Sequence, residues 1–177
     1  QLRWDEGEGA GIDDASISAR LTTLARGKGK QARRMGQGSR AIAGSATVLD
    51  AVYELPYLAH ATMEPMSCTA DVQADSVTLW APTQFQTGPK LLGGGTRGAA
   101  SRVTGVAMEK VTVHTTHLGG GFGRRSETDF VIEACEASQA AGAPVKVVWS
   151  REDDIRHDQF RPAARHVLRA GIGTDGT

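Results

Sequence analysis

Apolar residues recur at helical spacing near the start of the chain. Ile17, Leu21 and Leu24 follow Asp13 and Asp14, and either aspartate can cap the N-terminus of a helix. The spacing therefore predicts a helix that begins at one of the two aspartates.

A second apolar stripe predicts a helix over residues 126–141. Ser126 is a suitable N-terminal cap, Asp129 lies three residues further on, and Phe130 and Ala134 share one side. Gly142 ends the pattern, as glycine often does at a helix C-terminus. A shorter helix is predicted over residues 97–106.

Residues that favour β-structure fill most of the remaining segments. Val111 and Val113 alternate with polar residues, as in a half-buried strand. Predicted strands cover residues 2–4, 46–58, 67–80 (as a pair around 73–75), 109–117, 144–149 and 165–172. The order β, α, β, β, α, β, α, β occurs in mixed α+β and α/β domains. We assign the chain to the α+β class, with a mixed sheet and packed helices.

Composition excludes several classes of protein. The 177 residues hold 20 basic and 20 acidic side chains, so the chain lacks the surplus of Lys and Arg that a dedicated nucleic-acid binder needs. No run approaches the ~18 apolar residues of a transmembrane helix, so we expect no direct membrane insertion. The chain begins with Gln1, which we interpret as the start of a fragment; its compartment, periplasmic or cytoplasmic, stays open.

Two cysteines allow one disulfide at most. Cys135 falls within a helical stripe, where a buried and inert thiol is the commoner state, and Cys68 lies in a predicted strand. We favour two free thiols over a disulfide.

Basic residues are concentrated between residues 26 and 40 (RGKGKQARRMGQGSR), which hold six basic side chains, four glycines and no acid. Such a strip can hold nucleic acid or phosphate, but it lacks the aromatic side chains on which bases stack. We interpret it as a flexible, solvated loop, and a non-enzymatic module that binds polyanions through it is one alternative function.

Glycine is in excess, at 22 of 177 residues, and two clusters could bind a ligand. Residues 93–98 (GGGTRG) match the dinucleotide fingerprint G-x-G-x-x-G, which requires a preceding strand and an acidic residue ~20 positions on. The preceding segment holds Gly88 and Pro89 and makes a poor strand, and residues 114–120 offer no carboxylate. We interpret this first cluster as a flexible loop.

The second cluster, residues 119–125 (GGGFGRR), lies between a predicted strand and a predicted helix. Consecutive glycines let backbone N–H groups approach a ligand, and a helix N-terminus favours negative charge. Arg124 and Arg125 would add positive charge, so the segment suits a phosphate or another oxyanion. Phe122 either packs into a core or faces a ligand, and the residues alone do not distinguish these two possibilities.

Four segments together resemble one known family. They are residues 57–66 (YLAHATMEPM), 80–84 (WAPTQ), 119–125 (GGGFGRR) and 145–157 (VKVVWSREDDIRH). They resemble the large molybdopterin-binding subunit of the xanthine dehydrogenase/aldehyde oxidase family, in the branch of isoquinoline 1-oxidoreductase β subunits and related aldehyde dehydrogenases. The combination of P-T-Q with GGGFGRR is more specific than either motif alone.

The resemblance implies a molybdenum hydroxylase, which adds a water-derived oxygen to an electron-poor carbon of an N-heterocycle or an aldehyde. The implied cofactor is molybdenum-molybdopterin in its cytosine dinucleotide form. The implied partners are the remainder of the large subunit and a small iron–sulfur subunit that carries [2Fe-2S] clusters. No metal ligand from the protein is implied, because the dithiolene of the cofactor binds the metal.

The resemblance also assigns site residues. Gln84 would hydrogen-bond an oxygen ligand of the metal, and Phe122 would form a wall on the substrate side. Residues expected to line the pterin dinucleotide are Gly120, Gly121, Gly123 and Arg124. The segment between Gln84 and Gly119 is longer than in the family, and this insertion, around residues 88–98, could separate Gln84 from the loop.

The family's general base, a glutamate, has no counterpart in this chain, so we assign no catalytic residue and expect the isolated chain to be inactive. We interpret residues 1–177 as a fragment of a molybdopterin-binding subunit, with a basic loop at 26–40 and an α+β cofactor-binding region at 46–172. The alternative is a general phosphate- or nucleotide-binding α/β domain that uses residues 119–125.

Overall fold

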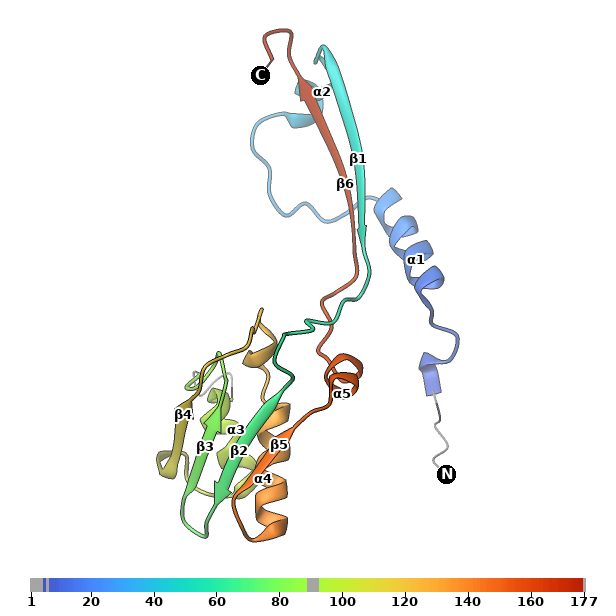
Figure 1. Cartoon of the computed structure of the whole chain (residues 1–177). Coiled ribbons are helices and arrows are strands. Elements are labelled where there is room, and N and C mark those ends of the chain that lie inside the picture. The colour runs from blue at the N-terminus through green and yellow to red at the C-terminus, as the bar shows by residue number, and fades with distance from the viewer. Residues whose placement is uncertain (1–4, 6, 89–92, 177) are drawn as a thin grey trace. The chain divides into compact units, whose positions relative to one another are not determined.

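The computed structural model describes residues 5, 7–88 and 93–176 (Figure 1). The strand expected at residues 2–4 and Pro89 lie outside this range. The chain divides into a central unit, residues 59–161, and a terminal unit formed by residues 1–58 and 162–177. The region expected at 46–172 therefore includes the whole central unit and parts of the terminal one.

The central unit contains a four-stranded sheet in the order β4-β3-β2-β5. Its strands are β2 (Ser67–Val72), β3 (Val77–Ala81), β4 (Val111–Thr115) and β5 (Val145–Val148). β2 is antiparallel to β3 and to β5, whereas β3 and β4 are parallel. The predicted mixed sheet is confirmed, including the strand pair that turns at residues 73–75.

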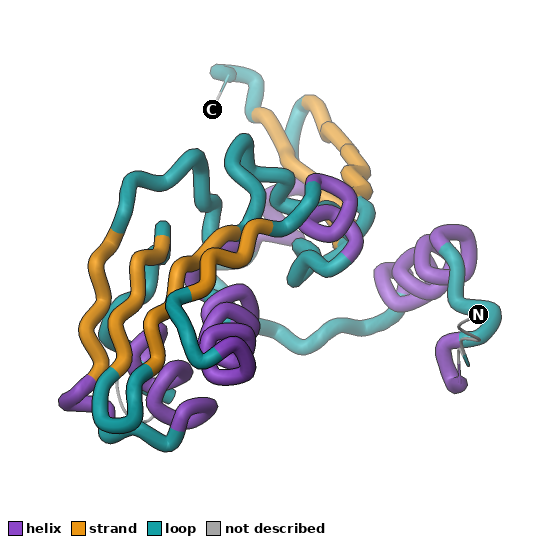
Figure 2. Tube along the Cα trace, turned by 60° about the horizontal axis from the view of Figure 1, so that its bottom comes forward, coloured by secondary structure: helices purple, strands orange, loops and turns teal. Residues whose placement is uncertain are grey.

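Helices cover one face of this sheet (Figure 2). α4 (Asp129–Ala141) packs against β2 and β5, and α3 (Gly95–Thr104) packs against α4 and β4. α5 (Arg151–Arg156), which the sequence analysis missed, is capped by the Ser150 side chain, since that hydroxyl accepts from the Asp153 N–H. The α+β class is confirmed.

Alternate residues of the strands point into the hydrophobic core of the central unit. Cys68 and Ala70 of β2 and Val77 and Leu79 of β3 are buried, while the residues between them are more exposed. The opposite side of the core comes from α4, through Phe130, Val131, Ala134 and Cys135.

The predicted start of the helix at Ser126 is wrong. Residues Arg124–Ser126 form a 3-10 turn, η4, and α4 begins at Asp129 after Thr128, which makes no side-chain capping bond. The Asp129 carboxylate bonds an arginine of η4 rather than serving a capping box. The C-terminal prediction is confirmed, because Gly142 caps α4 with φ of 61°.

The first glycine cluster is also different from its prediction as a flexible loop. α3 starts at Gly95, and the described residues just before the cluster, 82–88, form no strand. Glycine is needed for packing here, since a Cβ on Gly98 would lie 2.0 Å from the Gly93 carbonyl oxygen, and one on Gly95 2.5 Å from the Phe85 carbonyl oxygen. The cluster thus serves a tight helix entry.

Both thiols are free and buried, as expected, and burial raises the pKa of Cys68 and of Cys135 to about 12. We predict that neither reacts with a thiol reagent at pH 8 in the folded chain and that both react after unfolding, because thiolate is the reactive form. Labelling with and without urea, read by mass spectrometry, checks this prediction, and fast labelling of the native chain would contradict it.

The two thiols ionise near pH 9 in the unfolded chain but stay protonated to about pH 12 in the folded chain. The free energy of unfolding should therefore fall between pH 9 and 12.

The terminal unit pairs β1 (Thr47–Leu55) with β6 (Ala164–Ile172) in an antiparallel ribbon. The strands predicted at residues 46–58 and 165–172 are confirmed, whereas their pairing was not predicted. α1 (Asp14–Arg26) is capped by Asp13, whose carboxylate accepts from the Ser16 N–H. α2 (Gly38–Ala43) was not predicted and shortens the expected loop, which has no helix or strand over residues 27–37.

No described residue of the terminal unit is buried, although its ribbon is rich in apolar side chains. Leu49, Tyr53 and Leu55 of β1 share one face with Leu168 of β6, and all four are more than half exposed. Isolated two-stranded ribbons are marginally stable in water.

Among the described residues, no helix has both the length and the apolar character to cross a bilayer.

Candidate functional site

The candidate loop, residues 119–123, leads from the end of β4 toward η4. Its backbone adopts positive φ at Gly120 (96°), Phe122 (55°) and Gly123 (99°). Glycine adopts such values freely, but a bulky residue does so rarely. Phe122 is therefore held in an unfavourable backbone conformation, a feature that is concentrated at functional sites.

Phe122 projects away from the core. Its side chain is 66% exposed, which excludes the possibility that it packs into the interior of the central unit. A strained, exposed aromatic residue in a glycine loop is the arrangement that the ligand-facing alternative requires.

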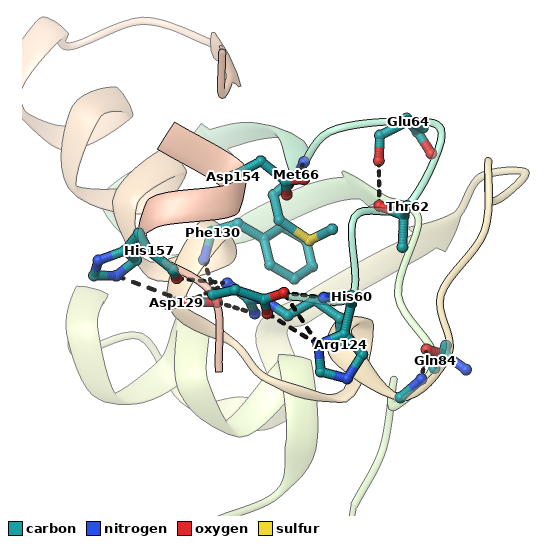
Figure 3. Close-up of polar contacts among 12 residues, drawn as sticks. His60, Thr62, Glu64, Met66, Gln84, Arg124, Asp129, Phe130, Asp154 and His157 are labelled. Atoms are coloured by element: carbon teal, nitrogen blue, oxygen red, sulfur yellow. Dashed lines mark hydrogen bonds and ion pairs between the residues drawn. The ribbon is translucent and has the colours of Figure 1, made fainter. Parts of the chain in front are cut away.

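Gln84 and the loop are in direct contact (Figure 3). The Gln84 side-chain oxygen accepts from the Gly123 N–H at 3.0 Å, and the Gln84 N–H donates to the Arg125 carbonyl at 3.0 Å. A Cβ on Gly121 would lie 2.4 Å from that side-chain oxygen, so the contact favours glycine there. The insertion around residues 88–98 does not separate Gln84 from the loop.

Backbone donors of the loop remain unused. The N–H groups at its two ends bond the Glu64 carboxylate and the Gln84 amide oxygen. Those between them, on Gly120, Gly121 and Phe122, donate to no other described residue. Gly121 is buried, and unpaired backbone donors at buried residues are rare in proteins. Three successive N–H groups of the loop thus lack an acceptor among the described residues.

Arg124 is buried beneath the loop, with 1% of its side chain exposed. Its guanidinium donates to both Asp129 oxygens, at 2.9 and 2.7 Å. Its Nε forms an ion pair with Oδ1 of Asp158 at 2.9 Å, but the geometry is not that of a hydrogen bond. The guanidinium also lies 5.5 Å from the centre of the Trp149 ring. Burial lowers the pKa of Arg124, but Asp129 and Asp158 outweigh burial and leave that pKa raised.

Arg125 is fully buried and binds the start of the loop. Its Nε donates to the Gly120 carbonyl at 2.7 Å, and its Nη2 donates to the Glu64 carbonyl at 2.7 Å and to the Glu64 carboxylate at 2.9 Å. Burial lowers the pKa of Arg125, and the charge of Glu64 only partly opposes that effect.

The oxyanion interpretation therefore needs correction in two respects. The side chains of Arg124 and Arg125 do not add charge beside a ligand, because both are buried and paired with the carboxylates of Asp129, Asp158 and Glu64. The loop also does not adjoin a helix N-terminus directly, since η4 and two further residues separate it from α4. What remains for an oxyanion is the row of backbone donors.

Sequence reasoning missed two carboxylates that hold this site. Glu64 lies within the segment 57–66 and Asp158 just after the segment 145–157, yet neither was given a role. The Asp158 carboxylate accepts from the His60 backbone N–H and lies 3.0 Å from the His60 Nδ1. No local sequence pattern predicts the contact between His60 and Asp158, because these residues lie 98 positions apart.

A family model for the molybdopterin cofactor-binding domain matches residues 24–177. The chain belongs to that family. The resemblance on the four motifs is confirmed, and the loop at 119–123 is therefore part of a molybdopterin cofactor-binding domain. The match includes most of the terminal unit and all of the central one.

Relatives and solved structures agree with the family assignment. Isoquinoline 1-oxidoreductase subunit beta of Brevundimonas diminuta is 39% identical over 124 residues, covering 70% of this chain and 14% of its own length. The aldehyde oxidoreductase molybdenum-binding subunit PaoC of Escherichia coli K12 is 28% identical, covering 81% of this chain and 19% of its own. CO dehydrogenase of Oligotropha carboxidovorans shares the fold, with a TM-score of 0.59 at 22% identity over 78% of this chain and 17% of its own. The chain thus spans less than a fifth of the length of these proteins.

Proposed function

We propose that this chain forms part of the molybdenum-cofactor-binding subunit of an oxidoreductase that hydroxylates N-heterocycles or oxidises aldehydes with water as the oxygen source. The observation that carries the proposal is the row of free backbone donors beside the exposed Phe122 and the Gln84 amide. Relatives named for isoquinoline and aldehyde oxidation support the two substrate classes.

The free donors suit the anionic part of the cofactor. The N–H groups of Gly120, Gly121 and Phe122 would hold a phosphate oxygen at close range, because no side chain of residues 120 and 121 obstructs the approach. The Gln84 oxygen is taken by the loop, so its Nε2 group is the donor left for an oxygen ligand of the metal. Phe122 would form a wall on the substrate side.

Gly123 and Arg124 would contribute to cofactor binding through the backbone. The Gly123 N–H fixes Gln84, and the Arg124 N–H donates to the Gly121 carbonyl at 3.0 Å, while the Arg124 guanidinium faces Asp129 and Asp158. When bound, the molybdenum centre supplies the two-electron chemistry and the water-derived oxygen. We assign the cofactor to the cytosine dinucleotide form and electron acceptance to [2Fe-2S] clusters on a small partner subunit. The general base lies outside this chain, which alone would be inactive.

The experiment is to purify the complete subunit with its co-purifying partners and to measure molybdenum by mass spectrometry and nucleotide released by acid. We expect molybdenum and cytosine monophosphate in equal amounts, together with iron. A complex that is active without molybdenum would contradict the proposal.

A general nucleotide-binding domain would behave differently. Such a domain should be stabilised against heat by ATP or NAD added to the 177-residue chain. We expect no shift of the melting temperature, because the arginine charges that would select a free phosphate chain are already paired.

A further inference from the structure

We propose that Glu64 is the residue that positions the cofactor-binding loop, by bonding Gly119 at the start of the loop and Arg125 just beyond its end. This inference rests on the function proposed above for the loop, and it assigns a role to a residue to which the resemblance gave none. Glu64 is a positioning residue, since it touches the loop and not the reacting atoms.

The first bond is made to the start of the loop. The Glu64 carboxylate oxygen Oε2 accepts from the Gly119 N–H at 2.9 Å, and the Glu64 N–H donates to the Gly119 carbonyl at 3.0 Å. A Cβ on Gly119 would lie 2.4 Å from the Glu64 Cβ, so the two backbones can approach only because residue 119 is glycine. Glu64 thus holds Gly119 through side chain and main chain together.

The second bond is made just beyond the end of the loop. Arg125 donates from one nitrogen, Nη2, to Oε2 of Glu64 at 2.9 Å and to the Glu64 carbonyl at 2.7 Å. The same arginine donates from Nε to the Gly120 carbonyl. One carboxylate oxygen therefore binds two groups that lie six positions apart in the sequence and on either side of Phe122.

Glu64 is itself held in place. The Thr62 hydroxyl donates to the Glu64 carbonyl at 2.6 Å (Figure 3), and the Ser67 hydroxyl donates to the other carboxylate oxygen at 3.3 Å. Arg125 is fully buried, so its charge needs a partner, whereas the Glu64 side chain is 35% exposed and reaches the surface where the loop lies. The Glu64 carboxylate thus links the buried charge of Arg125 to the surface loop, and this link helps to hold Phe122 in its strained conformation.

The test compares Glu64→Gln with Glu127→Gln in the 177-residue chain. Both substitutions remove one negative charge, but the exposed Glu127 side chain makes no hydrogen bond or ion pair with another described residue. Amide hydrogen exchange is measured for Gly119 and, as an internal reference, for the paired core residues Ala70 and Leu79. A neutral amide oxygen accepts more weakly than a carboxylate, so we predict exchange at Gly119 that is about tenfold faster in Glu64→Gln, with the core unchanged. Glu127→Gln should match the unmodified chain.

Equal exchange at Gly119 in both variants would overturn the proposal, and so would equal acceleration at Gly119 and in the core, which indicates general destabilisation. Molybdenum content of the complete subunit separates this proposal from the function on which it rests. Faster exchange with molybdenum lost only from Glu64→Gln supports both. A subunit that never holds molybdenum overturns the cofactor function, while the exchange result still decides the positioning of the loop.

Discussion

Replacing Asp158 by alanine is expected to lower the free energy of unfolding of the central unit by about 3 kcal/mol, because the buried Arg124 then keeps only the partly exposed Asp129 as a carboxylate partner. Asp158 is 2% exposed and lies against Arg124, which is 1% exposed. The same carboxylate also binds the His60 backbone N–H and lies 3.0 Å from its ring nitrogen. The substitution therefore affects three polar groups.

Urea unfolding of the 177-residue chain, followed by tryptophan fluorescence, measures this loss. Trp149 is a suitable probe because it is nearly buried and lies beside Arg124. Asp75→Ala is the matched control, since Asp75 is exposed in the turn between β2 and β3. Equal stability of the two variants would mean that Asp158 does not compensate the charge of Arg124.

Gly119→Ala is expected to distort the loop at residues 119–123 and, on the proposed function, to reduce the molybdenum held by the complete subunit at least about tenfold, as overpacking of a tight contact costs ~1–3 kcal/mol. The new Cβ would lie 2.4 Å from the Glu64 Cβ and 3.2 Å from the Glu64 nitrogen. Part of that contact is backbone, so the clash is relieved only if the loop moves.

Gly29→Ala serves as the control for this substitution, because a Cβ at residue 29 meets nothing within 4 Å. Molybdenum per subunit and the melting temperature are measured for both variants. Full molybdenum content in Gly119→Ala would show that the contact between Gly119 and Glu64 is not needed for cofactor binding.

Much of the fold could be predicted because it depends on local periodicity. The alternation of Val111 and Val113 correctly indicated β4, and the acid pair at residues 13 and 14 marked the start of α1. The start of α4 was misplaced because Ser126 looks like a cap in sequence but lies in η4. That local signal was overridden by the bonds of Asp129 to Arg124, which sequence spacing does not reveal.

The candidate site was predictable only in part. The family motifs located Gln84 and the glycine loop, and the structure brings them into contact. The sequence suggested that Arg124 and Arg125 would offer free charge, because arginine is usually exposed. Both are buried, because carboxylates far away in the sequence compensate their charges. Burial of a charge depends on such long-range pairs, so it could not be inferred from the motif.

The most direct test of the central claim is the position of molybdenum in crystals of the complete subunit, located by anomalous diffraction at the molybdenum absorption edge. We predict an anomalous peak beside Gln84 and Phe122, with cofactor density at the free N–H groups of Gly120 and Gly121. An anomalous peak remote from this loop, or density at the loop that holds no pterin, would contradict the assignment of residues 119–123 as the cofactor-binding loop.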